Sequence, residues 1–582
     1  MERFVALAWS RSDPNAARAA ARMKPWLAKQ FHRAFDTAGL EVWVGSNAAP
    51  KVSAIGDVVL IGERFGPLSP ALGPPIEHAR SLIAEGWGGY VGLVRRASSG
   101  LEAVFRDPSG VLDVLVWQVG DLVVAASEPF EELLDAAPPR LAIDQARLAA
   151  GLRDPTILAG QPALTGLLGV TPGGYRALGG APEEMLWRPI DIVRRQGALD
   201  GSPQALAACV DGVIAQLATP ETLSLVEVSG GLDSAVVAAA VARTGAPVAQ
   251  WLNYYIDVPA GDERPYARAL GEHLGVTITE ARKPPMALDF AALARHADGA
   301  RPGMRVLDTA YDLDLAERCV RLGAGRIFTG LGGDTVFQQG GHGWLGADLC
   351  WRRVPGLRDI APLTAIARRA KRSVWTVLRQ TLTAQWGAGP AVPNPMDALL
   401  TDAARPLASA VAAHPWLRGL EGAPPVKREQ ILGLTQTLSI QGGSRRAAVA
   451  RLVHPLLAQP VVEHCLALSC ATLAPGGDDR GLARAAFVDR LAPSIYRRRS
   501  KGDFTSYYAR MIGEGLEPLR ALLLDGELVR RGLIDANRLD AHLSLETLIH
   551  LGPTREVLSL VVQELWVRSW TARLARLARL SS

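Results

Sequence analysis

The sequence predicts an α/β protein in which antiparallel strands come first and a parallel sheet with helices follows. Short apolar runs, among them Phe4–Trp9 and the hairpin-like stretch "VLVWQVGDLVVAAS", indicate antiparallel strands with few helices over roughly the first 195 residues. From Ser202 onward, short apolar strands alternate with helical patterns, which is typical of a parallel sheet. Beyond Trp351 the sequence has mainly the pattern of helices and loops.

The length of the chain favours more than one domain. Its 582 residues, of which 48% are hydrophobic, exceed what a single hydrophobic core usually spans. A break containing glycine and proline near Gly197–Pro203 separates the strand-rich part from the alternating part. We therefore expect one domain over residues 1–198 and a second over residues 199–582.

Helical periodicity in the first part is limited to Asn15–Ala38 and Pro75–Glu85. The second part contains four short apolar strand candidates, with helical patterns between them. These candidates are Leu223–Val228, Val248–Tyr255, Val276–Ala281 and Gly325–Gly330. Since parallel strands need crossover connections of this kind, the four are expected to share one parallel sheet.

Charge and cysteine content exclude several classes of protein. The net charge is +5, but the arginines are spread along the chain rather than gathered with aromatic residues, so we expect no nucleic-acid partner. The five cysteines show no ligand spacing, which argues against a zinc site or a disulfide framework and fits a reducing cytoplasm. The apolar run at the N-terminus is too short for a signal peptide, and no stretch approaches membrane-spanning length. We expect a soluble cytoplasmic protein.

The stretch "SGGLDS" lies between the strand Leu223–Val228 and an alanine-rich helix. It consists of Ser229, Gly230, Gly231, Leu232, Asp233 and Ser234. Backbone N–H groups of a glycine-rich turn and a helix N-terminus together form an anion site, and the two serines add hydroxyl donors. Asp233 would repel a bare phosphate, so its presence indicates a bound cation, for which Mg²⁺ on a nucleotide is the best candidate. The alternative is a simple turn in which Asp233 stabilises the helix dipole.

A second strand, Gly325–Gly330, ends in another glycine-rich turn that carries an acid, Asp334. Ligands of open parallel sheets bind at the carboxyl ends of the strands. If the two strands are close in space, Asp233 and Asp334 can therefore hold one metal ion with its pyrophosphate. The alternative for Asp334 is an ordinary turn residue.

These two motifs resemble the asparagine synthetase family, whose members carry "SGGLDS" as the pyrophosphate loop of an ATP-pyrophosphatase domain. The stretch "GGYVGLV…LEAVFRDPSG…DLVVAASE" is similar to the glutaminase domain of that family. The resemblance implies a glutaminase-like (Ntn-type) αββα sandwich, followed by an adenine nucleotide α-hydrolase-like parallel-sheet domain with a largely helical extension. It also implies ATP and Mg²⁺ as cofactors, with Asp233 and Asp334 as metal ligands.

The same resemblance implies further roles for residues of this chain. Thr329 and Gly330 are expected near the α-phosphate, and Leu252 near adenine. Lys501, in "RRRSKGDF", matches a catalytic lysine that contacts phosphate and the acyl-transfer transition state. A flexible, protonated donor suits the charge that develops in both half-reactions.

The departures from the family pattern narrow the function. A working glutaminase needs a cysteine at position 2, where this chain has Glu2, and the first cysteine is Cys209. The first domain is therefore expected to be a scaffold, and the attacking amine must come from the substrate. A family glutamate that acts in catalysis falls on Arg451, and an aspartate that ends the same motif falls on Ala458.

Two family branches dispense with glutaminase activity: the β-lactam-type synthetases and the lasso-peptide macrolactam synthetases. Segments such as "LNYYIDVPAGDERPYARALGEHLG" and "HPLLAQPVVEHCLALS" look like the lasso branch. The predicted reaction adenylates an Asp or Glu side chain of a lasso core peptide and joins it to the N-terminal amine of the peptide. The expected partners are this peptide, a leader peptidase and a leader-recognition protein. The alternatives are a β-lactam-type or ammonia-dependent synthetase acting on a small molecule, and a scaffold without chemistry.

Overall fold

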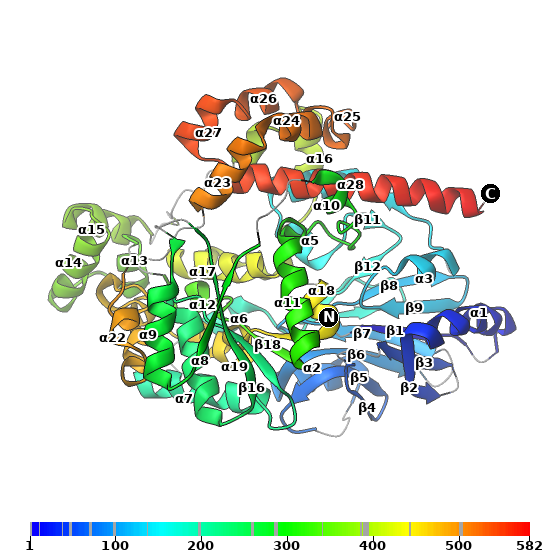
Figure 1. Ribbon diagram of the computed structural model, residues 1–582, viewed down its shortest axis with the longest axis horizontal. Helices are drawn as coiled ribbons and strands as arrows, with labels where there is room; N and C mark the ends of the chain where they lie inside the picture. Colours follow the sequence, from blue (N-terminus) through cyan, green and yellow to red (C-terminus); the bar gives the residue numbers. More distant parts are fainter. Residues whose placement is uncertain are drawn as a thin grey trace.

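The computed structural model contains two antiparallel sheets, one parallel sheet and a largely helical C-terminal part (Figure 1). The residues that it describes are 3–10, 12–37, 39–45, 49–68, 73–96, 100–136, 138–195, 199–257, 261–284, 289–339, 342–384, 387, 395–441, 444–499 and 505–581. No helix within these ranges is both long enough and apolar enough to cross a membrane.

Two six-stranded antiparallel sheets form a sandwich in the N-terminal part. The first has the order β12-β8-β9-β1-β3-β2 and the second the order β14-β13-β7-β6-β5-β4. The strands of the first sheet are β1 (Phe4–Ala8), β2 (Phe31–Thr37), β3 (Leu40–Gly45), β8 (Leu115–Val119), β9 (Leu122–Ala126) and β12 (Leu168–Gly169). Those of the second are β4 (Val52–Ile55), β5 (Val58–Phe65), β6 (Trp87–Arg96), β7 (Gly100–Arg106), β13 (Gly174–Ala177) and β14 (Glu184–Met185). A short pair, β10 (Ala142–Ile143) and β11 (Leu164–Thr165), lies outside both sheets.

The sandwich buries apolar side chains between its sheets and carries helices on both outer faces. Phe4, Val42, Ile61 and Val91 belong to the inner core, because alternate residues of each strand face the other sheet. Helices α1 (Pro14–Gln30) and α3 (Glu131–Ala136) cover the first sheet, and α2 (Pro75–Ala84) covers the second. This is a helix–sheet–sheet–helix layering.

The predicted helix Asn15–Ala38 is correct only in its first two thirds. The helix α1 begins after Asp13, whose carboxylate accepts the backbone N–H of Asn15 at 2.7 Å, and it ends at Gln30. The chain then continues as β2, which pairs with β3 from Phe31 onward. Pairing with the next segment of the chain, in a β-hairpin, therefore overrides the local helical pattern. The predicted helix Pro75–Glu85 is confirmed as α2.

The parallel sheet has the order β17-β16-β15-β18-β19, and the four strands expected in this part are confirmed. The strands are β15 (Ser224–Glu227), β16 (Val248–Tyr255), β17 (Ile278–Arg282), β18 (Arg326–Phe328) and β19 (Arg451–Val453). The fifth strand, β19, was not predicted, since three residues are too few for a recognisable pattern. Every pair is parallel, so the carboxyl ends of β15, β18 and β19 lie side by side.

Helices cover both faces of this sheet (Figure 1). On one face lie α7 (Pro203–Leu217), α8 (Leu232–Thr244) and α9 (Arg264–Leu274), which share a core with Val226 and Phe328. On the other face, α11 (Thr309–Leu322) and the end of α18 (Arg445–Val449) pack around Leu225 and Ile327. The remaining helices of the N-terminal part and the linker are α4 (Gln145–Arg153), α5 (Ile157–Gly160) and α6 (Pro189–Val193).

Most of the residues after β18 form helices, as the sequence predicts. Besides α18, these helices are α12 (Gly333–Val336), α13 (Leu345–Leu349), α14 (Ile360–Arg369), α15 (Val374–Thr383), α16 (Ala404–Ala410), α17 (Pro425–Thr437), α19 (Gln459–Ala467), α20 (Cys470–Leu473), α21 (Gly481–Ala486), α22 (Pro493–Tyr496), α23 (Thr505–Glu514), α24 (Leu516–Leu524), α25 (Glu527–Arg530), α26 (Ala536–His542), α27 (Leu545–Leu551) and α28 (Thr554–Ser581). Helix α10 (Phe290–Ala294) lies before β18.

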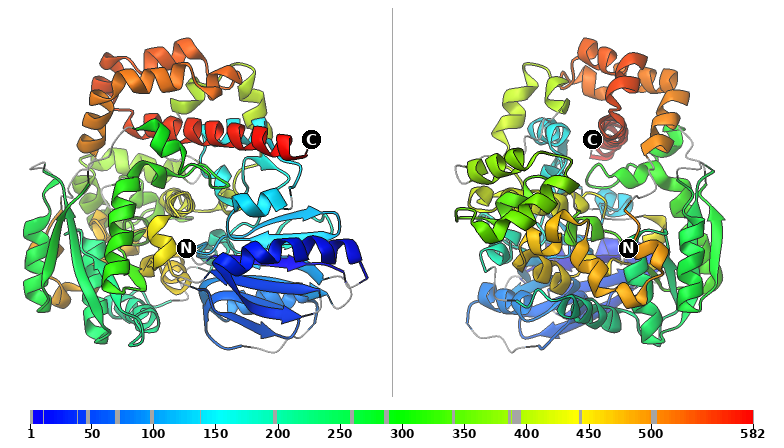
Figure 2. Two further views of the ribbon diagram at one scale, coloured as in Figure 1. Left: turned by 45° about the vertical axis from the view of Figure 1, so that its right-hand side comes forward. Right: turned by 90° about the vertical axis from the view of Figure 1, so that its left-hand side faces the viewer.

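The last helix, α28, returns to the N-terminal sandwich (Figure 2). Its Trp566 and Trp570 are fully buried, and both indole N–H groups donate to the carbonyl of Gly299, at 2.8 and 2.9 Å. They belong to a core that also contains Val5 of β1 and Leu134 of α3. The two ends of the chain thus share one hydrophobic core. The predicted boundary between residues 198 and 199 stays a prediction.

Candidate functional site

The loop after β15 has the backbone that an anion site requires. Gly230 has a φ of 79°, and a side chain there would lie 2.8 Å from the carbonyl oxygen of Glu263. Ser229 and Ser234 hold the turn closed, because their hydroxyl oxygens are 2.8 Å apart and the backbone N–H of Ser229 donates to Ser234 Oγ at 3.1 Å. Helix α8 follows at Leu232, so its N-terminal amides point toward the loop.

The turn after β18 packs directly against this loop. A Cβ atom on Gly330 would lie 2.4 Å from the backbone nitrogen of Ser234, and one on Gly333 would lie 2.4 Å from Cγ of Asp233. Only glycine permits so close an approach of the two backbones. The structure therefore brings together the two turns that the sequence singles out, including Thr329 and Gly330.

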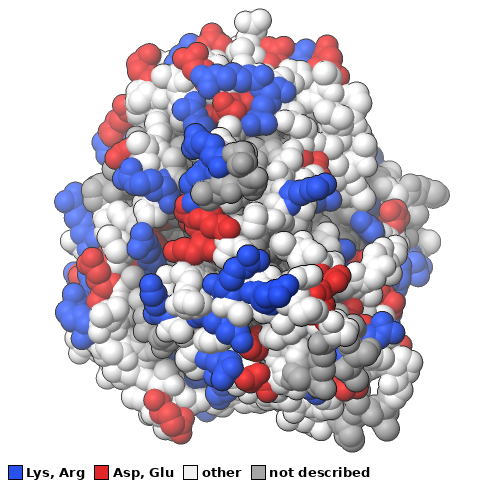
Figure 3. All heavy atoms as spheres, turned by 90° about the vertical axis from the view of Figure 1, so that its right-hand side faces the viewer, with Lys and Arg blue, Asp and Glu red and all other residues white. Residues whose placement is uncertain are grey.

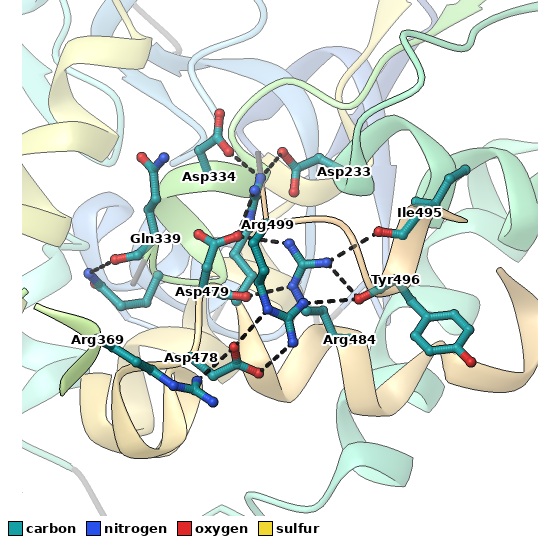
Figure 4. A network of polar contacts seen from close by, with 12 residues as sticks. Asp233, Asp334, Gln339, Arg369, Asp478, Asp479, Arg484, Ile495, Tyr496 and Arg499 are labelled. Atoms are coloured by element: carbon teal, nitrogen blue, oxygen red, sulfur yellow. Dashed lines mark hydrogen bonds and ion pairs between the residues drawn. The ribbon is translucent and has the colours of Figure 1, made fainter. Parts of the chain in front are cut away.

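The two acids of these turns, Asp233 and Asp334, lie close together (Figure 4). Both converge on one guanidinium group, that of Arg480. Arg480 Nη1 donates to Asp233 Oδ2 at 2.9 Å, and the same nitrogen bonds to Asp334 Oδ1. Its Nη2 pairs with Asp479 Oδ2 at 2.8 Å, and Arg484 binds that same oxygen. Asp233 and Asp334 are therefore close enough to share a single cation.

Arg480 is a buried residue that sequence reasoning missed. It is 5% exposed, has a φ of 50° and is the N-cap residue directly before α21. Burial by itself would lower the pKa of Arg480, but the carboxylates of Asp233, Asp334 and Asp479 raise it above its ordinary value. The stretch "GGDDRGLAR" belongs to a segment that resembles the lasso branch, but no pattern in it points back to two distant acids.

The residues at this edge fit a magnesium ion. Mg²⁺ takes hard oxygen ligands, and one or two carboxylates suffice because it keeps several waters and binds phosphate oxygens as well. Asp233 is 7% exposed, whereas the side chain of Asp334 is 38% exposed, so the pair is open on one side only. Within the described residues, no cluster of three or more acids, histidines or cysteines offers a denser metal site.

A histidine lies at the carboxyl end of β19, next to the end of β18. His454 directly follows β19, and its Nδ1 lies 2.7 Å from Oγ1 of Thr329 at the end of β18. Burial and the nearby Arg446 lower the pKa of His454 to about 3, so the imidazole is neutral at pH 7. Its position beside the predicted α-phosphate residue was not foreseen, because no second ligand residue is near it in the sequence.

The predicted adenine residue, Leu252, does not present its side chain to the two turns. The side chain is 1% exposed and lies in the core between the sheet and α11. The carbonyl of Leu252 accepts the N–H of Val228, and the buried amide of Asn253 donates to the carbonyl of Val228 at 2.6 Å. Strand β16 therefore holds Val228, the residue directly before the loop, in place by hydrogen bonds. A contact of Leu252 with adenine stays a prediction.

Lys501 lies outside the described residues. The segment that leads to it is anchored beside the loop, since Arg498 donates to Glu263 Oε1 at 2.8 Å and stacks over Tyr266, 3.8 Å from the ring centre. Glu263 is the residue whose carbonyl would meet a side chain on Gly230. The basic segment up to Arg499 therefore borders the glycine-rich loop.

Arg451, which occupies the position of a family glutamate, points away from this edge. It forms an ion pair with Glu63 of β5, and Arg326 donates to the other oxygen of Glu63 at 2.9 Å. All three residues are less than 10% exposed. Ala458 is buried at the start of α19 and carries no acid. The described residues thus place no carboxylate from these two positions at the site.

A parallel sheet with two interlocked glycine-rich turns and a shared cation position at its carboxyl edge defines a nucleotide-binding α/β enzyme. The family model described as asparagine synthase matches residues 213–570, which is more than half of the chain. The chain belongs to the asparagine synthase family and is an ATP-dependent amide-forming ligase.

No curated protein matches the sequence significantly. Among solved structures, one described as the allosteric regulatory enzyme of purine biosynthesis is 13% identical, with a TM-score of 0.18. That match covers 56% of this chain and 82% of the other. A likeness at that level carries no argument about function.

Proposed function

We propose that this ligase is a macrolactam synthetase, which closes an isopeptide ring in a lasso-type core peptide. It adenylates an Asp or Glu side chain of the peptide and joins that side chain to the peptide's own N-terminal amine. The observation that carries the adenylating step is the convergence of Asp233 and Asp334 on one cation position beside an anion-binding loop. Glu2, in place of a nucleophilic cysteine, supports an amine other than glutamine-derived ammonia. Arg451 departs from the glutamate that the family resemblance implies.

The reaction has two steps. A carboxylate oxygen of the peptide attacks the α-phosphorus of ATP, so that a C–O–P bond forms, the bond to the β-phosphate breaks and pyrophosphate leaves. The neutral N-terminal amine then attacks the acyl carbon, AMP leaves, and the nitrogen loses one proton as the amide forms. Activation is required because an amine and a carboxylate at neutral pH form a salt rather than an amide.

The chain supplies charge stabilisation in both steps. The backbone amides of Gly230 and Gly231, with the hydroxyls of Ser229 and Ser234, are suited to hold the pyrophosphate. Asp233 and Asp334 would ligate Mg²⁺, which neutralises phosphate charge when it is bound. Thr329 and Gly330 lie beside this loop, where the α-phosphate would be attacked.

Arg480 has two roles in this proposal. It balances the two carboxylates in this structure, and its guanidinium would be available to the pyrophosphate if Asp233 and Asp334 held Mg²⁺. Lys501 is assigned to the phosphate and to the acyl-transfer transition state by its resemblance to the family lysine. Positioning of amine and acyl carbon in one site supplies about 7–11 kcal/mol of the barrier reduction.

The test uses purified protein, ATP, Mg²⁺ and a pool of synthetic peptides that have a free N-terminus and a single aspartate or glutamate at successive positions. Any core peptide found encoded near the gene, together with a leader peptidase encoded there, forms a second arm. We expect peptide-dependent AMP and a product that has lost one water by mass spectrometry. Asp233→Asn and Lys501→Ala should abolish this product, whereas Asp211→Asn should not, because Asp211 of α7 pairs with Arg490.

Other outcomes identify the alternatives. AMP formation with a small amino acid and ammonia, but not with any peptide, would favour a small-molecule synthetase. No AMP with any of these partners would support a scaffold without chemistry. Undiminished product from Asp233→Asn would remove the shared cation position from the mechanism.

A further inference from the structure

A cavity of about 790 Å³ lies between the antiparallel sandwich and the helices that flank the parallel sheet. The sandwich contributes Arg3, Arg106 and Asp113 to its wall, and the second part contributes the beginning of α11, the beginning of α18 and Arg573 of α28. Basic and acidic side chains are intermixed on the face shown in Figure 3. We call this cavity the interdomain chamber.

The interdomain chamber is far too large for a passage that delivers ammonia. A molecule the size of water occupies about 30 Å³ in the liquid, whereas cavities of about 300–1,000 Å³ hold ligands of drug size. The first described residue, Arg3, lies in the chamber wall with its guanidinium 4.5 Å from the ring centre of Phe130.

Elements in two walls of the chamber are hydrogen-bonded to elements of the candidate active site. On α11, Asp312 lines the chamber, and the preceding Tyr311 hydrogen-bonds Glu227, the last residue of β15 before the glycine-rich loop. On the opposite side, Leu438 lines the chamber just after α17, while Gln430 of α17 donates to the carbonyl of Val336 at 2.9 Å. Val336 belongs to α12, the short helix that carries Asp334. The chamber wall is therefore connected to the site through two packed elements, while the two glycine-rich turns themselves do not line the chamber.

The charges in the chamber wall are largely satisfied by the protein itself. Arg106 is 5% exposed, donates to three backbone carbonyls and pairs with Asp113 at 3.0 Å. Arg301 pairs with the same aspartate, and Asp312 accepts the backbone N–H of Arg445 at 2.5 Å. The six arginines in the wall face six acids, so the wall has no net charge to attract a nucleotide or a free phosphate.

Exposed apolar surface adds to this mixed wall. Leu313, next to Asp312 on α11, is 47% exposed although it is a large hydrophobic residue. A neutral wall with apolar patches and polar backbone groups suits a ligand that has both characters along its length, as a peptide backbone with side chains does. A single amino acid would leave most of such a volume unfilled.

We propose that the interdomain chamber binds the peptide substrate and holds the segment that joins its N-terminal amine to its acceptor carboxylate. This inference rests on the proposed function, because it assigns a site to the peptide of that reaction. Holding this segment in a fixed path brings the amine to the acyl carbon and raises their effective concentration. The scaffold part of the chain thereby forms half of the substrate site.

The experiment compares variants that narrow the chamber with a control on the same helix. Leu313→Trp and Ala448→Phe, on α11 and α18, each add a large side chain to the wall at residues that are not fully buried. Val320→Trp changes a residue of α11 that is 69% exposed and does not line the chamber. Thermal unfolding and circular dichroism check that all three variants are folded.

We expect each chamber variant to raise the KM for the best synthetic peptide by roughly tenfold or more, with the KM for ATP unchanged. The affinity for a fluorescein-labelled copy of that peptide, measured without ATP, should fall by a similar factor. Val320→Trp should match the wild type in both. If the wild type is active and both chamber variants keep its KM and affinity for the peptide, the chamber assignment is wrong while the proposed function stands. If the wild type forms no AMP with any peptide, both proposals fall.

Discussion

Arg451 of β19 forms a buried ion pair with Glu63 of β5, across the interface between the parallel sheet and the antiparallel sandwich. Arg326 of β18 joins the same carboxylate, and Lys51 approaches it at 3.6 Å. The carboxylate of Glu63 in the sandwich thus balances the charges of two arginines, which belong to two strands of the parallel sheet. Arg451, at the position where the family resemblance implies a glutamate, therefore links the two parts of the chain.

Glu63→Gln should destabilise the protein strongly. The substitution leaves Arg326 and Arg451 buried without their shared carboxylate, and breaking a buried ion pair from one side costs about 3–5 kcal/mol. Equilibrium unfolding in urea measures the change in the free energy of unfolding. Glu77→Gln, which removes an exposed pair with Arg80, serves as the control and should cost about 1 kcal/mol or less. Equal stability of the two variants would contradict this role of Glu63.

Asp334→Asn should raise the Mg²⁺ concentration needed for half-maximal AMP formation. The variant keeps the shape of the side chain but loses one of the two charges that face the shared cation position. At saturating Mg²⁺ the rate should still be lower by about 100-fold, since this charge supports the transferring phosphoryl group. A magnesium titration of AMP release gives both values. A wild-type titration curve for Asp334→Asn would exclude Asp334 as a metal ligand.

Arg480→Ala should make the thermal stability of the protein depend on Mg²⁺. Without the guanidinium, Asp233 and Asp334 repel each other across a buried contact, and a divalent cation can take its place. We therefore expect a lower Tm than in the wild type, and a larger rise of Tm on adding Mg²⁺. Arg490→Ala, which breaks a partly exposed pair with Asp211, is the matched control and should show no such dependence. An unchanged response to Mg²⁺ would argue against a shared cation position.

Asp348→Asn should increase stability at neutral pH relative to the wild type. Burial raises the pKa of Asp348 to about 7 from 3.8, so the folded protein binds more protons than the unfolded chain between these values. Ionisation of Asp348 therefore lowers the stability of the wild type progressively as the pH rises from about 4 to about 7. The asparagine can still accept the backbone N–H of Val426 and does not ionise.

The difference in the free energy of unfolding between Asp348→Asn and the wild type should grow across that pH range by an amount on the order of 3–4 kcal/mol. Urea unfolding at several pH values measures it. The exposed Asp402→Asn provides the control, and its curve should run parallel to that of the wild type. A constant difference between Asp348→Asn and the wild type would show that Asp348 ionises normally.

The local sequence pattern predicts which helices and strands form better than it predicts the residues at which they begin and end. The four strands from Leu223 to Gly330 were correct because each is apolar, short and bounded by glycine or by a helix start. The end of α1 at Gln30 was missed, since only the pairing of β2 with β3 decides it. The three-residue strand β19 exists through its neighbour β18 and has no pattern of its own.

The residues of the candidate site likewise differ in how far the local sequence pattern predicts them. The two glycine-rich turns carry their chemistry in contiguous residues, so the sequence alone predicts their meeting at one sheet edge. Arg480 and His454 join them through the course of the chain between α17 and α21, which no periodicity predicts. The side-chain direction of Arg451, toward Glu63 rather than the site, likewise depends on how the two parts pack.

The core that α28 shares with β1 and α3 has a consequence for engineering. A fragment cut after residue 198 would lack Trp566 and Trp570, which share a core with Leu134. It would therefore expose a large apolar surface to solvent and to other molecules. Such a fragment should aggregate, and swapping the first part between relatives should fail unless the last helix is exchanged with it. The first and last segments of the chain therefore depend on each other for a buried core.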